Sequence, residues 1–182
     1  MTHSPEAYIS VDVESSGPCP PLYSMLSIGA CLVERPDCSF YRELQPIGTL
    51  AVVEAIEVVG KPLEYFASHG HRAETVMAEF EEWIREVADG GQPVFVGFNA
   101  AFDWAFVNYY CHTYLHQNPF GFAPIDIKAF FMGMLGTSWE DTRSSQIPGE
   151  FKGTTRQTHN ALDDARAQAE MFKKMLVHQR RR

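Results

Sequence analysis

The order in which strand-type and helix-type patterns follow one another constrains the fold of this chain most strongly. Three runs typical of β-strands come first, at residues 7–13, 25–34 and 39–46, and the first of them alternates apolar and polar residues. Helical apolar spacing over residues 73–88 follows, and short apolar runs then alternate with further helical segments. This order predicts an α/β fold with a mixed sheet, in which an antiparallel three-strand meander is followed by parallel strands flanked by helices.

The second half of the chain contains two strand-to-helix units and a long last helix. The run PVFVGF at 93–98 is wholly apolar, as in a strand buried on both faces. Asn99 follows it as a candidate cap for a helix over residues 100–116. A shorter unit of the same kind spans 123–135, and apolar residues in helical phase predict a helix over 160–177.

Size, composition and charge narrow the functional class. The 182 residues are 45% hydrophobic and can build a sizeable core, so we expect one domain over residues 1–182. No apolar stretch is long enough for a membrane span and the first residues do not resemble a signal peptide, which predicts a cytoplasmic protein with no membrane partner. The four cysteines form no CxxC pair and are expected to be reduced. The net charge of −8 disfavours a protein that coats long nucleic acid, but it is compatible with carboxylates gathered around divalent cations.

Charge is distributed unevenly along the chain. Residues 166–182 carry six Lys or Arg against Glu170 alone. These cations either complement the dipole at a helix C-terminus or act as a weak electrostatic guide for a substrate strand. The segment 136–158 has no strand or helix periodicity, and its cations either contact phosphates or are solvated: Arg143, Lys152 and Arg156.

Acidic residues and one histidine stand where ligand sites are commonly built. Asp12 and Glu14 end a buried-looking strand and share one face, as an ordinary acidic pair or as a cation site. Asp103 falls in the first turn of a helix after an apolar strand, where it either complements the helix dipole or joins a ligand site. His159 precedes the last helix and Asp164 lies in its first turns, which is either a polar helix start or a third part of the site.

Three motifs carry a resemblance to a known family. DVESSG, GFNAAFD and HNALDDA occur in this order, and the chain resembles the DEDDh exonucleases of the RNase H-like superfamily, which include the polymerase proofreading epsilon subunit, RNase T and oligoribonuclease. The family patterns D-x-E-[TS]-x-G, [HF]-N-x-x-F-D and H-x-A-x-x-D match at Asp12, Glu14, Ser15, Gly17, Asn99, Phe102, Asp103, His159, Ala161 and Asp164. The resemblance covers nearly the whole chain, and it favours Asp164 over its neighbour Asp163, which we expect to be solvated. Asp126 is expected to be a structural acid, or an acid that supports the metal ligands, rather than a ligand itself.

The resemblance implies a metal-dependent active site. It assigns the roles of metal ligands to Asp12, Glu14, Asp103 and Asp164, which would hold two divalent cations, Mg²⁺ or Mn²⁺, against the scissile phosphate. It assigns the role of general base to His159, because an imidazole can take a proton from water near neutral pH. It also suggests residues that would bind the 3′-terminal nucleotide: Ser15, Ser16, Gly17, Asn99 and Phe102. Tyr23, Met25 and Leu26 are either base-stacking residues or core residues.

The implied activity is a 3′-to-5′ exonuclease acting on single-stranded RNA or DNA 3′ ends and releasing nucleoside 5′-monophosphates. As the substrate, RNA or short oligonucleotides are slightly favoured over DNA. The alternatives are a catalytically inactive nucleic-acid-binding or interaction module and a DNA proofreading subunit associated with a polymerase. A homodimer is expected by analogy with family members alone. Most relatives have a further helix where this chain has the segment 136–158, so the shape of the substrate cleft does not follow from the resemblance.

Overall fold

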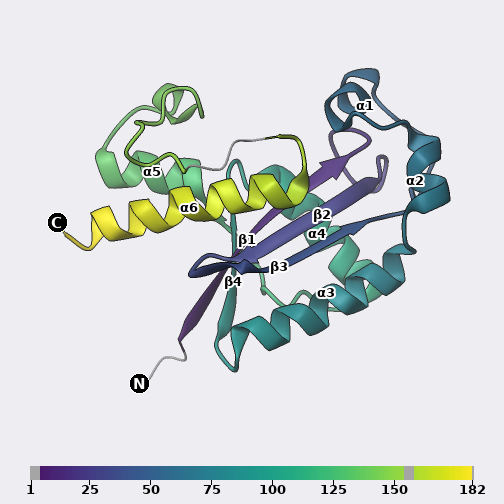
Figure 1. Ribbon diagram of the computed structural model, residues 1–182, viewed down its shortest axis with the longest axis horizontal. Helices are drawn as coiled ribbons and strands as arrows, with labels where there is room; N and C mark the ends of the chain where they lie inside the picture. The colour runs from purple at the N-terminus through teal and green to yellow at the C-terminus, as the bar shows by residue number, and fades with distance from the viewer. Residues whose placement is uncertain (1–4, 154–157, 182) are drawn as a thin grey trace.

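A five-stranded mixed sheet forms the centre of the protein. The structure is a computed structural model that describes residues 5–153 and 158–181. The strands lie in the order β3-β2-β1-β4-β5 (Figure 1), with the bounds β1 Glu6–Ser15, β2 Met25–Leu32, β3 Arg35–Glu43, β4 Gln92–Gly97 and β5 Ile125–Asp126. Strands β1, β2 and β3 pair antiparallel, whereas β4 pairs in parallel with both β1 and β5. The predicted fold class, a meander followed by parallel strands, is confirmed.

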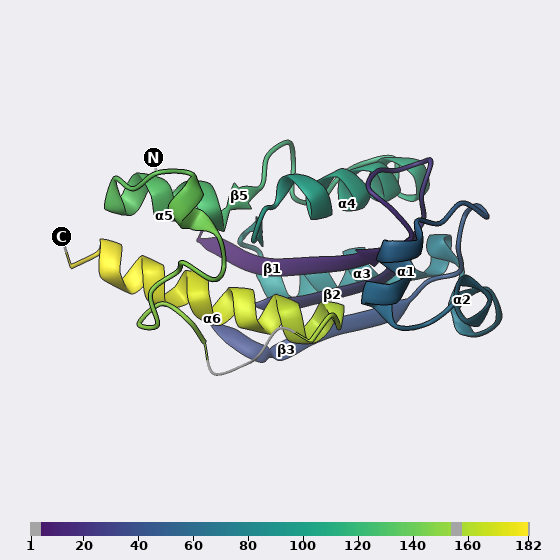
Figure 2. The same ribbon diagram turned by 90° about the horizontal axis from the view of Figure 1, so that it is seen from above.

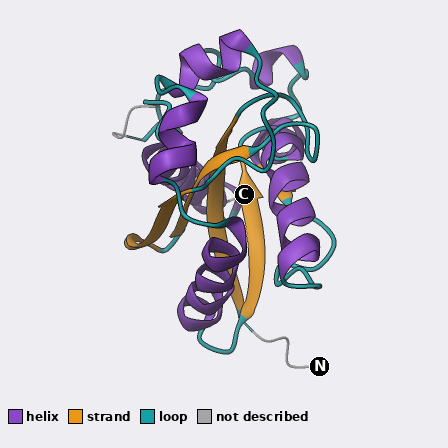
Figure 3. Cartoon of the chain, turned by 90° about the vertical axis from the view of Figure 1, so that its right-hand side faces the viewer, coloured by secondary structure: helices purple, strands orange, loops and turns teal. Residues whose placement is uncertain are grey.

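Helices cover both faces of the sheet. Helices α3 (Ala73–Ala88) and α4 (Ala101–Tyr114) pack on one face, and α5 (Ile127–Leu135) and α6 (Ala161–Gln179) pack on the other (Figures 1 and 2). Seen from the side in Figure 3, the strands run between these helices. Two short helices, α1 (Val53–Val59) and α2 (Leu63–His69), lie beyond the end of β1, and a 3₁₀ turn, η1 (Glu140–Thr142), follows α5.

The alternation of side chains along β1 decides which of them face each helical layer. Ile9, Val11 and Val13 are at most 4% exposed and belong to the core under α3 and α4. Successive side chains of a strand point to opposite faces, so Asp12 and Glu14 project toward α6. One strand therefore supplies both a core and a polar site.

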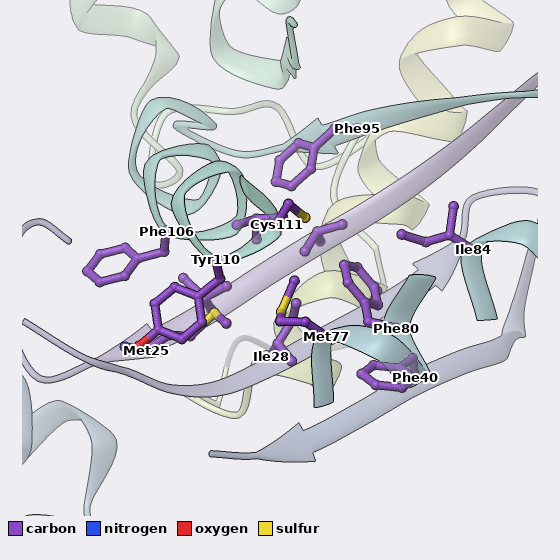
Figure 4. Packing of buried hydrophobic residues seen from close by; sticks show 14 of the residues in the cluster. Met25, Ile28, Phe40, Met77, Phe80, Ile84, Phe95, Phe106, Tyr110 and Cys111 are labelled. Atoms are coloured by element: carbon purple, nitrogen blue, oxygen red, sulfur yellow. Dashed lines mark hydrogen bonds between the residues drawn. The ribbon is translucent and has the colours of Figure 1, made fainter. Parts of the chain in front are cut away.

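The core under α3 and α4 fixes the position of α4 (Figure 4). Phe106 and Tyr110 of α4 are fully buried with Phe80 of α3 and Phe95 of β4. The Tyr110 hydroxyl accepts a hydrogen bond of 3.0 Å from the backbone N–H of Met25, which satisfies a buried polar group. This contact ties α4 to the start of β2, and with it the first turn of α4, which contains the second acidic motif.

A glycine in β2 allows α6 to lie directly on the sheet. A Cβ atom at Gly29 would come 2.2 Å from the backbone carbonyl carbon of Ala161, so any other residue would push the helix away. Gly29 is the ladder partner of Asp12 in β1. The side chain of Asn160 caps α6 by accepting bonds from two backbone N–H groups of its first turn. The first turn of α6, which contains Asp164, is therefore brought close to Asp12.

Most predicted elements are confirmed, and the differences have local causes. The predicted helix over 73–88 coincides with α3, whereas β3 begins at Arg35, before the predicted run. The prediction that Asn99 caps α4 is wrong, because Asn99 has a left-handed φ of 63° and the N-cap position is taken by Ala100, which makes no side-chain cap bond. Helices α1 and α2 were not predicted.

The segment 136–158 is more ordered over its described residues than its sequence suggests. It contains η1. Ile147 and Phe151 are each 2% exposed and belong to a second hydrophobic core, which includes buried residues of α5 and α6. All four cysteines are free. Within residues 5–153 and 158–181, no helix has the length and apolar character needed to cross a membrane.

Candidate active site

Four carboxylates from three elements approach one another where β1 extends past β4. Strand β4 pairs with β1 only as far as Ser10, so Asp12 and Glu14 lie beyond the end of that pairing. Asp103 lies in the first turn of α4, and Asp164 in the first turn of α6. The negative charges of the other three carboxylates act on Asp12, which places all four within electrostatic reach of one another.

Beyond the end of the β1–β4 pairing, the side chain of Asp103 supplies a hydrogen-bond acceptor to the backbone of β1. Its Oδ1 accepts a bond of 3.0 Å from the backbone N–H of Val13, and its residue is 4% exposed. Burial raises the pKa of Asp103 to about 7, although bonds from backbone N–H groups oppose the rise. The carboxyl group is thus held rigidly against β1 in a poorly solvated position.

Asp12 is held from the other side by Gln168 of α6. The Gln168 Nε2 donates a bond of 2.6 Å to Asp12 Oδ1, and its Oε1 accepts a bond of 3.0 Å from the backbone N–H of Phe98. A backbone N–H can only donate, which fixes the orientation of the amide. Burial, followed by the charges of the other carboxylates, raises the pKa of Asp12 well above its ordinary value, while the Gln168 bond opposes the rise.

Glu14, His159 and Asp164 form a close group of potential ligands. Each offers one ligand atom, and these atoms lie within 4.8 Å of one another. Burial, with the charges of Asp164 and Asp103, raises the pKa of Glu14 to about 8. Asp164 is 6% exposed, and burial also raises its pKa, opposed by a 2.8 Å bond from the N–H of Thr158 and by His159. His159 itself is exposed and has a left-handed φ of 57°.

The electrostatics of this cluster favours a bound cation. Several carboxylates that are poorly solvated and close together resist ionisation, and a divalent cation removes that penalty by supplying the opposite charge. Carboxylate oxygens are the donors that Mg²⁺ and Mn²⁺ prefer. The residues present therefore fit a divalent metal ion of this class.

The second half of the first motif, residues 15–17, forms a closely bonded loop. The Ser15 hydroxyl donates a bond of 2.7 Å to the carbonyl oxygen of Gly17. Ser16 is fully buried, and its hydroxyl donates to the carbonyl oxygen of Leu50 and accepts from the N–H of Ser24, both at 2.9 Å. The Ser16 side chain thus joins two loops.

The other candidates for nucleotide contact differ in exposure. Asn99 is exposed and Phe102 is half-buried at the start of α4. Met25 and Leu26 are fully buried, so core packing accounts for both, whereas Tyr23 is only partly buried. The side chains of Asn99, Phe102 and Tyr23 therefore remain available to a ligand.

Sequence reasoning missed Gln168 and described Asp126 correctly. The available signal for Gln168 was a polar residue at a core-facing position of a helix, one turn after Asp164. Asp126 has the structural role expected of it. It caps α5 by accepting two backbone bonds, and its second oxygen accepts from the N–H of Ala100 at 2.9 Å, which fixes the start of α4.

Asp163 and Arg143, two of the charged residues considered in the sequence, form ion pairs within the protein. Asp163 is part-exposed beside Asp164 and forms a long ion pair of 3.9 Å with Arg166. Arg143 pairs with Glu140 on the loop after α5. Arg156, which was considered as a phosphate contact, lies outside the described residues.

The fold and the site together define a class of protein: an RNase H-like α/β protein with an acidic cluster at its central strand whose residues fit a divalent cation. The sequence profile of a family described as Exonuclease, the RNase T family, matches residues 54–172. The chain is also 48% identical to the 3′-5′ DNA exonuclease Cap18 of Escherichia coli over 174 residues. The aligned residues cover 95% of this chain and 93% of that protein. The chain belongs to this exonuclease family, and its resemblance to the DEDDh exonucleases is confirmed.

Two solved structures show the same fold. A 3′-exonuclease, from work on 3′-end specific recognition of a histone mRNA stem-loop, superposes with a TM-score of 0.75 at 16% identity over 94% of this chain. This chain spans 63% of that protein's chain. The nuclease domain of 3′hExo, a DEDDh family member bound to rAMP, superposes with a TM-score of 0.72 at 15% identity, covering 94% of this chain and 92% of that one.

Proposed function

We propose that this protein is a metal-dependent 3′-to-5′ exonuclease. It hydrolyses phosphodiester bonds from the 3′ end of single-stranded nucleic acid and releases nucleoside 5′-monophosphates. The observation that supports this most strongly is the convergence of four carboxylates and one histidine from β1, α4 and the start of α6, in a chain of the exonuclease family.

In this proposal the carboxylates of Asp12, Glu14, Asp103 and Asp164 hold two divalent cations, Mg²⁺ or Mn²⁺. Such ions, when bound, neutralise charge on the scissile phosphate and make water a better nucleophile. The protein contributes orientation: the N–H of Val13 holds Asp103 and the amide of Gln168 holds Asp12. Ligands fixed in this way need little rearrangement when the metal and the substrate bind.

His159 is the proposed general base. Its ring lies beside Glu14 and Asp164 but is exposed, so water and substrate can approach it. A neutral imidazole nitrogen can accept a proton from the attacking water near neutral pH. The Asn160 cap that follows fixes the start of α6 and thereby the position of His159.

The proposed substrate is a single DNA strand, with RNA as the competitor. The sequence placed RNA slightly ahead, but the relative that is 48% identical is named a DNA exonuclease. We propose that the 3′-terminal nucleotide lies among Ser15, Gly17, Asn99 and Phe102, and that Ser16 holds the shape of this loop. A contact to the 2′-hydroxyl would be needed to prefer RNA.

A cleavage assay on labelled strands tests this proposal. Matched single-stranded DNA and RNA carrying a 5′ label are incubated with Mn²⁺, Mg²⁺ or EDTA, and products are separated on a denaturing gel. We expect a metal-dependent ladder that shortens from the 3′ end. The His159→Ala variant should be slower by roughly 10²–10⁴-fold, the range typical of a lost acid–base group. The Asp12→Asn variant should also be slower, because it replaces a proposed metal ligand. Asp163→Asn, at the part-exposed neighbour of Asp164, should leave the rate unchanged.

Each possible failure has a separate meaning. Binding of the strands without any product under either metal would support the inactive binding module instead. Cleavage that persists undiminished in both variants would exclude these residues as the catalytic site. Faster shortening of RNA than of DNA would restore the preference expected from the sequence.

A further inference from the structure

A concave surface lies along the C-terminal half of α6, away from the acidic cluster. This groove has a volume of about 530 Å³ and is formed by α6 and the end of the loop after η1. Phe151 and Val177 supply its apolar lining, and Lys173, Lys174 and Arg181 supply cations. The ring of His178, which also lines the groove, packs edge-on against Phe151, with 5.3 Å between the ring centroids.

Two of the three cations that line this groove form no ion pair within the part of the chain that the structure describes. Lys173 pairs with Glu34 at 3.0 Å, but neither Lys174 nor Arg181 forms an ion pair with any described residue. The ammonium group of Lys174 donates to the carbonyl oxygen of Lys152, a bond that leaves its charge uncompensated. Glu150 is the one carboxylate among the lining residues. The groove is thus positive in a chain whose net charge is −8.

The groove lies on the same helix as part of the proposed active site. Asp164 and Lys174 are ten residues apart on one helix, and Asp164 and the helix end at Gln179 are fifteen apart. At 1.5 Å per residue these separations are about 15 and 22 Å. Successive phosphates of a stacked strand are about 3.4 Å apart along its axis, so this distance corresponds to roughly four to six nucleotides.

We propose that this groove binds the phosphates of the substrate strand roughly four to six nucleotides upstream of the 3′ end being cleaved. The inference rests on the proposed exonuclease function. An acidic protein repels a polyanion, so an uncompensated positive groove on the helix that carries part of the active site compensates locally for that repulsion. Val177, which is 42% exposed, also offers an apolar surface to a base or sugar.

Strand length separates this role from a purely structural one. A short substrate held at the active site does not reach the groove, whereas a long one does. If the cations only complement the dipole of α6, neutralising them changes thermal unfolding without any dependence on strand length.

The test compares two double variants. Lys174→Gln with Arg181→Gln removes two charges from the groove. Arg72→Gln with Arg85→Gln removes two charges at the start and end of α3, on the opposite face of the sheet, where both side chains are more than 70% exposed. Anisotropy of a labelled fifteen-nucleotide single strand is titrated in EDTA at several salt concentrations. In parallel, kcat/KM is measured with Mn²⁺ on that strand and on a trinucleotide.

For the groove variant we expect affinity for the long strand to fall by about tenfold, with the salt dependence reduced by about 1.4 in log–log slope, since each lost phosphate contact accounts for about 0.7. Its kcat/KM on the trinucleotide should equal that of the wild type, and the α3 variant should match the wild type throughout. An equal loss on both lengths, or no loss on the long strand, would overturn the proposal. Absence of hydrolysis by the wild type would contradict the exonuclease activity itself, and the anisotropy comparison would still decide whether the groove binds the strand.

Discussion

Gln168 connects a candidate metal ligand to the end of a neighbouring strand through one buried amide. It is 3% exposed, donates to Asp12 and accepts from the N–H of Phe98, the residue that follows β4. Mutation of residues that orient metal ligands typically lowers metal affinity or activity by about 10–100-fold. Gln168 is therefore a positioning residue for the carboxylate of Asp12.

Replacing Gln168 with Leu should impair the site without removing a ligand. The Leu side chain cannot donate to Asp12, so the carboxylate loses its fixed orientation, and we expect Mn²⁺ affinity or kcat to fall by roughly 10–100-fold. Calorimetric titration with Mn²⁺ measures the affinity directly, independently of cleavage. The matched control is Gln179→Leu at the exposed end of the same helix, which should bind Mn²⁺ like the wild type. Unchanged Mn²⁺ affinity and unchanged kcat in Gln168→Leu would show that Asp12 is oriented without it.

At the level of single residues, the sequence predicted charged groups better than their surroundings. Asp12 and Glu14 were candidates because they end a buried-looking strand, Asp103 because it follows an apolar strand, and Asp164 because of the family motif. The structure brings these four within electrostatic reach of one another. Gln168 could not be assigned, since its partners are 70 and 156 residues away in the chain. The same limit applies to Ser16, which was predicted to bind substrate. Its hydroxyl bonds to Leu50 and Ser24 could not be inferred from the sequence.

At the level of elements, the approach of α6 to β2 depends on the absence of a side chain at Gly29. A methyl group there would meet the backbone of Ala161 at 2.2 Å, and backbone cannot move aside as a flexible side chain can. The helix would have to shift, carrying Asp164 and Gln168 away from β1. Packing and catalysis should therefore fail together.

Gly29→Ala should lower both stability and activity. Overpacking of this kind typically costs about 1–3 kcal/mol, and we expect kcat to fall further than the fraction of folded protein does, because Asp164 is displaced. The control is Gly133→Ala in α5, where an added Cβ meets nothing within 4 Å and should stabilise the helix by up to about 1 kcal/mol. Thermal unfolding and cleavage rates measure the two effects. Wild-type activity in Gly29→Ala would refute the argument that this contact sets the position of α6.

Elements were predictable where a helix buries one face and unpredictable where it does not. Helix α3 buries Val76, Phe80 and Ile84 at helical spacing, and its predicted limits agree with the structure. Helix α1 has no buried residue, and Val53 is 69% exposed, so its apolar residues form no core-facing stripe. Asn99 shows the opposite failure: Asn suits both a helix cap and a left-handed turn, and the sequence does not distinguish these two uses.

At the level of the whole molecule, the acidic cluster couples folding to pH and to metal ions. Burial raises the pKa of Glu14 to about 8 and that of Asp103 to about 7, and the pKa values of Asp12 and Asp164 are raised as well. The ordinary values are 4.5 for Glu and 3.8 for Asp. Between about pH 5 and 8 the folded protein therefore retains protons that the unfolded chain has released. Glu43 and Asp141 have lowered pKa values, so their effect on the pH dependence of the free energy of unfolding falls below this window.

The free energy of unfolding of the metal-free protein should consequently fall as pH rises from about 5 to 8. The folded state binds more protons than the unfolded state, so each retained proton makes the slope more negative by about 1.4 kcal/mol per pH unit. Divalent cations bind the ionised carboxylates, so the stabilisation by Mn²⁺ should grow over the same range. Thermal unfolding in EDTA and in excess Mn²⁺ across this window measures both trends.

The Glu14→Gln variant shows whether the carboxylates cause this pH dependence. Its amide cannot ionise, so in EDTA near pH 8 it should unfold at a higher temperature than the wild type, although it lacks a proposed ligand. In Mn²⁺ the order should reverse, because the wild type gains more from the metal ion. A wild type whose melting temperature in EDTA is constant or rises between pH 5 and 8 would show that the four carboxylates are better solvated than their burial indicates, and would remove the electrostatic argument for a cation at this site.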